Sequence, residues 1–278
     1  MTIKRVFEQY RGFRYFNDKV SILVKAISLT KKDVSLTNKQ LTSYGQALLE
    51  FFNSMQGIDI RHENDGIILK PESFPKVEDQ TLFKYVPESI VKTYISKGIF
   101  QLGSINFYRQ TENKKIQDKL EGYSNLVINA DHRQLNITLT SGFNFYIFCG
   151  TSCSNLDSQM NKKFGEKVIQ IPNIIAFAKA VQKSIGAIRF YINRVQYADL
   201  KIYHINDNSF DVESAASPDI NEKVFKSLYN YSFLPSLYVK PSGFSPEQEI
   251  RIVFEMPRDT KKIIRISNKG LLDYIQIK

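Results

Sequence analysis

Short runs in which apolar and polar residues alternate dominate the second half of the chain. This period of two is typical of β-strands that bury one face. Most of these runs are flanked by turn residues and are rich in Val, Ile, Phe and Tyr. The pattern predicts strands at residues 82–86, 99–108, 124–129, 135–140, 143–148, 187–195, 201–205, 237–239, 249–254 and 263–266.

Apolar residues spaced three and four apart predict helices in three other places. Residues 37–55 carry an apolar stripe behind Thr37 and Gln40, which have capping-box spacing. Residues 173–185 follow Pro172 and precede Gly186, as a helix start and end should. A short helix is expected at 88–96. The apolar segment 20–29 fits either type of element, and residues 57–69 are expected to form short strands around a turn.

Two prolines among charged and polar residues mark the segment 70–80 as a boundary. It would separate an N-terminal mixed module, residues 1–72, from a larger domain, residues 73–278. We expect the module to support folding or partner binding and to supply no catalytic group. The mixture of strands and helices predicts an α+β fold.

Composition excludes several classes of protein. The longest apolar stretches fall well short of the roughly 20 residues that span a bilayer, and from the first residues we expect no secretory signal. Only Cys149 and Cys153 are present, and the three His residues are scattered. We therefore expect a cytoplasmic protein with no membrane partner, no disulfide framework and no metal site.

The chain is strongly basic, with a formal net charge of +10 and a pI near 9.3. A positive field of this kind attracts nucleic acid and other polyanions. The excess is +4 in residues 1–70 and +6 in residues 71–278, so it forms no separate binding tail.

The segment 240–254 is the most informative for chemistry. A loop with two prolines feeds a strand in which Glu247, Glu249 and Arg251 occupy alternate positions. Strand alternation would direct these three side chains to one face. A solvated strand start, with Glu249 paired to Arg251, is the structural alternative.

This loop and its Glu-any-Glu arrangement resemble the catalytic strand of ADP-ribosyltransferase-like bacterial toxins and phage-defence effectors. The resemblance covers roughly residues 80–255. It implies a split, curved β-sheet domain with peripheral helices that uses NAD as co-substrate. Glu249 would be the catalytic residue that holds the nicotinamide ribose, and Glu247 would help to activate the acceptor.

Other motifs occur in the order that this family shows. Lys84 and Tyr85 lie where the family places an Arg or His that contacts NAD, and the Lys departs from that pattern. Thr151 and Ser152 end a strand as the family's Ser/Thr motif does, and would contact NAD. Hydroxyl residues at a strand end are also ordinary turn chemistry.

The segment 107–122 resembles a bacterial subset of toxin-like domains with this fold. Tyr108 would stack on nicotinamide or a base, and Arg109 would bind phosphate. Asp118 and Glu121 are three residues apart, which would place them on one helix face. Such pairs usually face solvent, so a site role for them is the less favoured interpretation.

The resemblance and the charge together predict a toxin-like enzyme that transfers ADP-ribose to nucleic acid, with RNA favoured over DNA. Phage defence or a toxin–antitoxin system would be its setting, and an antitoxin protein its partner by analogy. A metal-independent RNA-cleaving toxin and a non-catalytic nucleic-acid-binding protein remain alternatives, since Lys, Arg, Tyr and Glu suit either.

Overall fold

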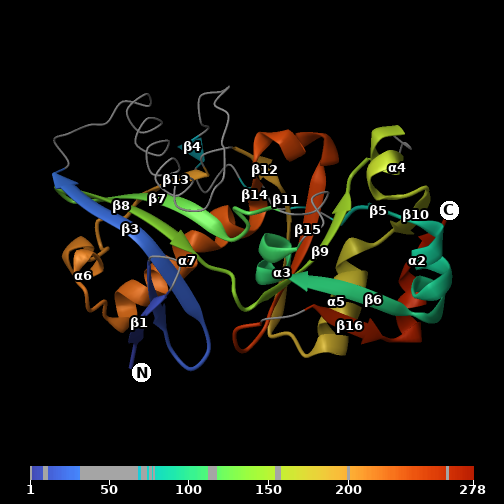
Figure 1. Ribbon diagram of the computed structural model, residues 1–278, viewed down its shortest axis with the longest axis horizontal. Helices are drawn as coiled ribbons and strands as arrows, with labels where there is room; N and C mark the ends of the chain where they lie inside the picture. Colours follow the sequence, from blue (N-terminus) through green and yellow to red (C-terminus); the bar gives the residue numbers. More distant parts are fainter. Residues whose placement is uncertain are drawn as a thin grey trace. The chain divides into compact units, whose positions relative to one another are not determined.

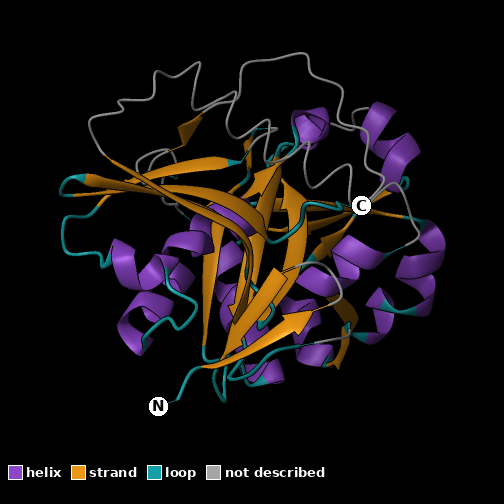
Figure 2. Cartoon of the chain, turned by 60° about the vertical axis from the view of Figure 1, so that its left-hand side comes forward, coloured by secondary structure: helices purple, strands orange, loops and turns teal. Residues whose placement is uncertain are grey.

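The computed structural model describes residues 2–8, 12–31, 68–69, 74, 77, 79–111, 118–153, 158–198, 201–260 and 263–278. The helix expected at 37–55 and most of the segment 57–69 lie outside these residues. The fold is α+β, with several sheets (Figures 1 and 2).

The chain forms two compact units that alternate along the sequence. Unit 1 comprises Met1–Ser73, Gly122–Gly142 and Gln196–Ser242, and unit 2 comprises Phe74–Glu121, Phe143–Val195 and Gly243–Lys278. The first crossing falls at the expected boundary. The contiguous division into residues 1–72 and 73–278 is nevertheless not the division that the contacts make, because N-terminal strands pair with strands from later in the chain.

Unit 1 contains a seven-stranded sheet in the order β1-β2-β3-β8-β7-β13-β4. The strands span Lys4–Glu8, Gly12–Phe16, Ser21–Lys31, Arg133–Thr140, Tyr123–Ala130, Ile202–Asn206 and Ile68–Leu69 in that order. Helix α7 (Glu222–Tyr238) packs on β7, β8 and β13, and α6 (Val212–Ala216) packs on β3 and β8. A short pair of strands, β12 (Gln196–Tyr197) and β14 (Val239–Lys240), completes the unit.

The ambiguous segment 20–29 belongs to a strand. β3 pairs with β8 from Leu23↔Thr140 to Lys31↔Arg133, with a bulge between Val24 and Ala26. The hairpin of β1 and β2 and helix α7 have no counterpart among the sequence predictions. Helix α7 has Asn221 as its N-cap and spans residues 222–238, so Leu237 lies in the last turn of a helix and does not begin a strand.

Unit 2 contains an eight-stranded sheet with the main path β11-β15-β9-β5-β10-β17, and β6 joins it by pairing with β9 and β16. The strands on the path span Arg189–Arg194, Glu249–Glu255, Phe145–Thr151, Leu82–Val86, Lys167–Ile171 and Gln276–Ile277; β6 spans Ile99–Ser104 and β16 Ile264–Ser267. The helices are α2 (Glu88–Thr93), η2 (Ile95–Lys97), α3 (Ile105–Gln110), α4 (Ser158–Phe164), α5 (Ile174–Ile185), η3 (Ser242–Glu247) and η4 (Lys269–Tyr274).

Helix α5 confirms its prediction in detail. The Asn173 side chain accepts a hydrogen bond from the Ala176 amide, and Gly186 ends the helix in the left-handed conformation with φ 66°. Phe177, on the apolar stripe, packs against Phe100 and Phe148 in the core of unit 2. The caps and the stripe together explain why this segment is helical.

The strand expected at residues 99–108 is half strand and half helix. β6 ends at Ser104, whose hydroxyl accepts a hydrogen bond from the Phe107 amide at 3.2 Å and caps α3. Tyr108 and Arg109 therefore lie on a helix. The cap is a local signal that outweighs the β-propensity of the aromatic residues here.

Candidate active site

The candidate site of unit 2 is built around the start of β15. Ile250, Ile252 and Phe254 enter the hydrophobic core, and alternation places Glu249 and Arg251 on the other face. Glu249 is opposite Thr151 on β9. Both charged residues are buried, with exposed fractions of 4% and 2%. The alternative of a solvated strand start is thus wrong, although its pairing of Glu249 with Arg251 is correct.

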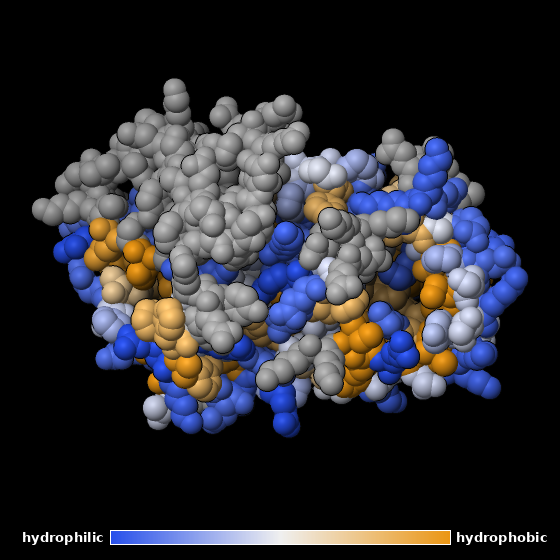
Figure 3. Space-filling view, in the orientation of Figure 1, coloured by the Kyte–Doolittle hydropathy of each residue, from blue (hydrophilic) through white to orange (hydrophobic). Residues whose placement is uncertain are grey.

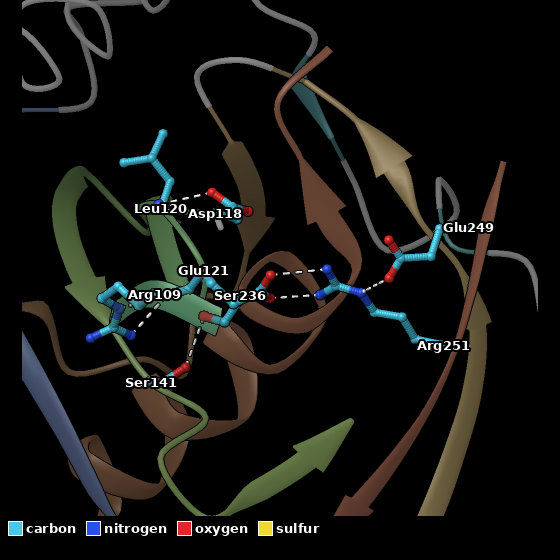
Figure 4. Close-up of polar contacts among 8 residues, drawn as sticks. All are labelled: Arg109, Asp118, Leu120, Glu121, Ser141, Ser236, Glu249 and Arg251. Carbon is cyan, nitrogen blue, oxygen red and sulfur yellow. Dashed lines mark hydrogen bonds and ion pairs between the residues drawn. The ribbon is translucent and has the colours of Figure 1, made fainter. Parts of the chain in front are cut away.

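Arg251 binds two carboxylates (Figure 4). Its Nε donates to Oε1 of Glu249 at 2.5 Å, and its Nη1 and Nη2 donate to Oε1 and Oε2 of Glu121 at 2.6 and 2.9 Å. Burial alone would lower the pKa of Arg251, but the Glu121 and Glu249 carboxylates outweigh it and hold that pKa well above its ordinary value. A charged guanidinium therefore fixes the position of both carboxylates.

Glu121 reaches Arg251 from a turn, not from the helix face that the sequence suggested. Arg109 donates from Nε and Nη2 to the Glu121 carbonyl oxygen at 3.0 and 2.7 Å, and the Asp118 carboxylate accepts from the Leu120 amide at 2.8 Å (Figure 4). Asp118 and Glu121 are both buried. Arg109 thus anchors the turn, and its phosphate contact stays a prediction.

A pocket of about 70 Å³ opens beside Glu249. Strands β5, β9 and β15, helix α4 and the end of η3 line it, through Phe83, Lys84, Tyr85, Cys149, Gly150, Thr151, Met160, Phe164, Glu247 and Glu249. Five of the eight site residues predicted from the sequence are in this lining: Lys84, Tyr85, Thr151, Glu247 and Glu249. Strand order explains the convergence, because β9 lies between β15 and β5.

Lys84 brings a half-buried amine to the pocket. Its Nζ donates to the Cys149 carbonyl oxygen at 2.8 Å and lies 4.7 Å from the centre of the Phe148 ring. Burial lowers the pKa of Lys84, while Cys149 and Glu249 act in the opposite direction. In this conformation the amine thus bonds to the protein itself, and it links β5 to β9.

Glu247 reaches the pocket by a different route from the one expected. It ends η3, and Gln248 then turns the chain with φ 41° before β15 begins. The strand alternation that we expected therefore does not extend to Glu247. Its carboxylate pairs with Lys163 of α4 at 2.6 Å, and the Lys163 amine also lies 5.2 Å from the Phe244 ring centre.

Tyr108 and Ser152 are not in the pocket lining. Burial raises the pKa of Tyr108 well above its ordinary value, and Cys149 and Glu249 add to the effect. The Tyr108 hydroxyl thus lies close enough to Glu249 and Glu121 for their charges to favour its protonated form. The Ser152 hydroxyl accepts a hydrogen bond from Arg194 at 3.2 Å.

Sequence reasoning missed two parts of this site. It gave Glu121 only a minor chance of a role, although Glu121 supplies the bidentate partner of Arg251. It did not identify helix α4, which contributes Met160 and Phe164 to the pocket and Lys163 to Glu247. Helix α4 spans only seven residues, too few to give a clear helical period.

No protein-family model, curated protein or solved structure matches the chain. Within the described ranges, no group of three or more His, Cys, Asp or Glu side chains is arranged to hold a metal ion. Nor does any helix of those ranges have the length and apolar character needed to cross a membrane.

Proposed function

We propose that unit 2 is the catalytic unit of a toxin-like ADP-ribosyltransferase, which cleaves NAD and transfers ADP-ribose to nucleic acid, with RNA favoured over DNA. The convergence of Glu249, Glu247, Lys84, Tyr85 and Thr151 on one pocket carries the proposal. Its eight-stranded sheet would then be the split sheet of that fold.

The chemistry begins at Glu249. When the bond between the ribose and nicotinamide breaks, nicotinamide leaves with the bonding electrons and positive charge develops on the ribose. A carboxylate held in place before the reaction stabilises that charge without reorganisation. The hydrogen bond from Arg251 and the burial of both residues supply this preorganisation.

Glu247 would serve the second half of the reaction. A nucleophile of the acceptor bonds to the anomeric carbon and must lose a proton, which the Glu247 carboxylate can accept as general base. Lys163, 2.6 Å away, would orient that carboxylate. Water in place of the acceptor would give NAD hydrolysis by the same steps.

The pocket constrains how NAD could bind. Its volume of about 70 Å³ is well below the ~300–1,000 Å³ of sites that enclose a whole small molecule. It would therefore receive only the nicotinamide end, with the adenosine half outside. Thr151 and Tyr85 would contact that end, the former through its hydroxyl and the latter through its ring.

The net charge of +10 supports nucleic acid as acceptor, because Lys and Arg concentrate a phosphate backbone around the protein. A role in phage defence or with an antitoxin follows only from the sequence resemblance. An RNA-cleaving toxin and a non-catalytic binding protein are the outcomes that compete with this proposal.

The test is release of nicotinamide from NAD by the purified full chain, with label transfer to RNA, DNA and protein followed in parallel. Glu249→Gln should lower nicotinamide release by about a hundredfold or more, since it removes a preorganised charge. Glu255→Gln is the matched control, because Glu255 ends the same strand and pairs with Arg189. It should leave the rate within about twofold.

Three results would overturn the proposal. Full NAD cleavage by Glu249→Gln would remove the catalytic role of that residue. RNA scission by the wild type without NAD would favour a nuclease. Binding of RNA with neither reaction would favour a non-catalytic protein. Because Glu249 is buried against Arg251, thermal unfolding should first establish that each variant is folded at the assay temperature.

A further inference from the structure

The edge hairpin of unit 1 exposes large apolar side chains. β1 is the first strand of the seven-stranded sheet and pairs only with β2 on this path. Phe7 is 63% exposed, Phe13 42% and Val6 50%. Exposed apolar side chains that lie next to one another often mark an interaction surface.

Phe7, Phe13 and Arg5 form what we call the aromatic ledge. Phe7 and Phe13 are paired across β1 and β2, with ring centres 5.5 Å apart and planes at 65°. The Arg5 guanidinium lies 4.9 Å from the centre of the Phe13 ring, and its Nη1 donates to the Pro218 carbonyl oxygen at 2.6 Å. Arg5 is therefore held in place beside the rings.

The N-terminal segment that carries the ledge is basic in sequence. Residues 2–31 contain seven Lys or Arg and two Asp or Glu. Lys4 and Arg5 lie on the edge strand itself, and both are exposed. In Figure 3, hydrophobic and hydrophilic atoms lie side by side over the region of β1 and β3. Flat apolar rings flanked by cations match the two chemical components of a nucleic acid strand, its bases and its phosphates.

We propose that the aromatic ledge binds single-stranded RNA, with bases stacked on Phe7 and Phe13 and a phosphate paired with Arg5. Stacking on aromatic side chains exposed on a sheet is a general mode of single-strand recognition. The role as acceptor site rests on the proposed function of unit 2. The binding itself requires neither NAD nor Glu249.

Charge argues against a second copy of the chain on this edge. Two copies joined at this edge would bring together two N-terminal segments, residues 2–31, that each carry seven Lys or Arg and two Asp or Glu. Like charges so placed repel. A polyanion gains from the same charges, so nucleic acid fits this edge better than strand addition does.

The experiment measures affinity of the full chain for a fluorescein-labelled single-stranded 20-nucleotide RNA by anisotropy, without NAD. Phe7→Ala and Phe13→Ala should each weaken binding by about fivefold to 150-fold, the usual effect of losing one stacking partner. Phe7→Trp should retain the affinity. Arg5→Gln should reduce the salt dependence by about 0.7 in the slope of log K against log salt.

Val6→Ala is the matched control. Val6 is as exposed as the phenylalanines but lies on the opposite face of β1, where it pairs with Arg14. It should leave the affinity unchanged. Equal effects of Val6→Ala and Phe7→Ala, or equal affinity for blunt duplex DNA and single-stranded RNA, would overturn the stacking proposal.

Sedimentation of the RNA-free protein tests whether a second copy of the chain occupies this edge instead of RNA. A concentration-dependent dimer that Phe7→Ala abolishes, with no RNA binding, would assign the edge to a second copy. Repeating the RNA measurement with Glu249→Gln separates the two proposals. This variant should keep the RNA affinity while losing NAD cleavage. In the wild type, absence of RNA binding with intact NAD cleavage refutes the ledge alone, and RNA binding without NAD cleavage refutes the catalytic assignment alone.

Discussion

The Nε atom of Arg251 lies 2.5 Å from Oε1 of Glu249, two positions earlier on the same strand. Side chains at this spacing share a face of a strand. The guanidinium then uses its two remaining nitrogens for Glu121. A buried cation thus pairs with two buried anions. Removing one of these groups would leave an uncompensated buried charge, which is strongly destabilising.

Arg251→Met should destabilise the protein by about 3–5 kcal/mol, because it leaves the Glu121 and Glu249 carboxylates buried without their cation. Urea unfolding measures the change. Arg189→Met is the control, since Arg189 also pairs with a carboxylate of β15 but is 61% exposed. Its effect should be below about 1 kcal/mol. Similar losses for both variants would contradict the special role of the buried cluster.

Glu247→Gln should impair transfer of ADP-ribose more than NAD hydrolysis, because its proposed partner is the acceptor nucleophile. General-base catalysis contributes about 10²–10⁴ in rate. The ratio of transferred label to nicotinamide released measures the split.

Lys163→Gln tests the orientation of Glu247 without removing its carboxylate. It should shift the same ratio in the same direction by a smaller factor, as loss of an orienting partner does. Lys162→Gln is the control, because Lys162 is exposed and adjacent to Lys163 on α4. Phe164, the other neighbour of Lys163, lines the pocket and is unsuitable as a control. An unchanged ratio in both the Glu247 and Lys163 variants would remove Glu247 from the mechanism.

Lys84 should make stability depend on pH in the alkaline range. Burial lowers its folded-state pKa below the ordinary value of 10.5. The unfolded chain therefore binds more protons just below that pH, and the stability of the wild type relative to Lys84→Met should rise as pH increases toward about 10.5. Urea unfolding of both proteins from about pH 8 to 10 measures this. A flat Lys84 difference would contradict the lowered pKa.

Deleting residues 1–72 should unfold or aggregate unit 1 and not leave an intact larger domain. The deletion removes β1, β2, β3 and β4, and it exposes the edge of β8 that β3 covers. Unpaired strand edges promote aggregation. Gel filtration and circular dichroism of residues 73–278 measure the outcome. A monomeric protein with undiminished strand content would support the contiguous module expected from the sequence.

Local chemistry determined several elements from the sequence alone. Asn173 and Gly186 mark the ends of α5, and alternation places Ile250 and Ile252 in the core. Caps and periodicity act within a few residues, so a linear pattern is enough to read them. The pocket residues Glu249 and Thr151 also came from short motifs that end or begin strands.

Only the tertiary structure decided which distant residues meet. Glu121 lies 130 positions before Arg251, yet it provides the bidentate carboxylate. The strands of unit 1 likewise come from three separate stretches of chain. Such contacts depend on strand order and register, which are selected by the burial of the whole core. The residues around Glu121 do not encode strand order or register. The sequence alone therefore could not distinguish Glu121 from a surface carboxylate.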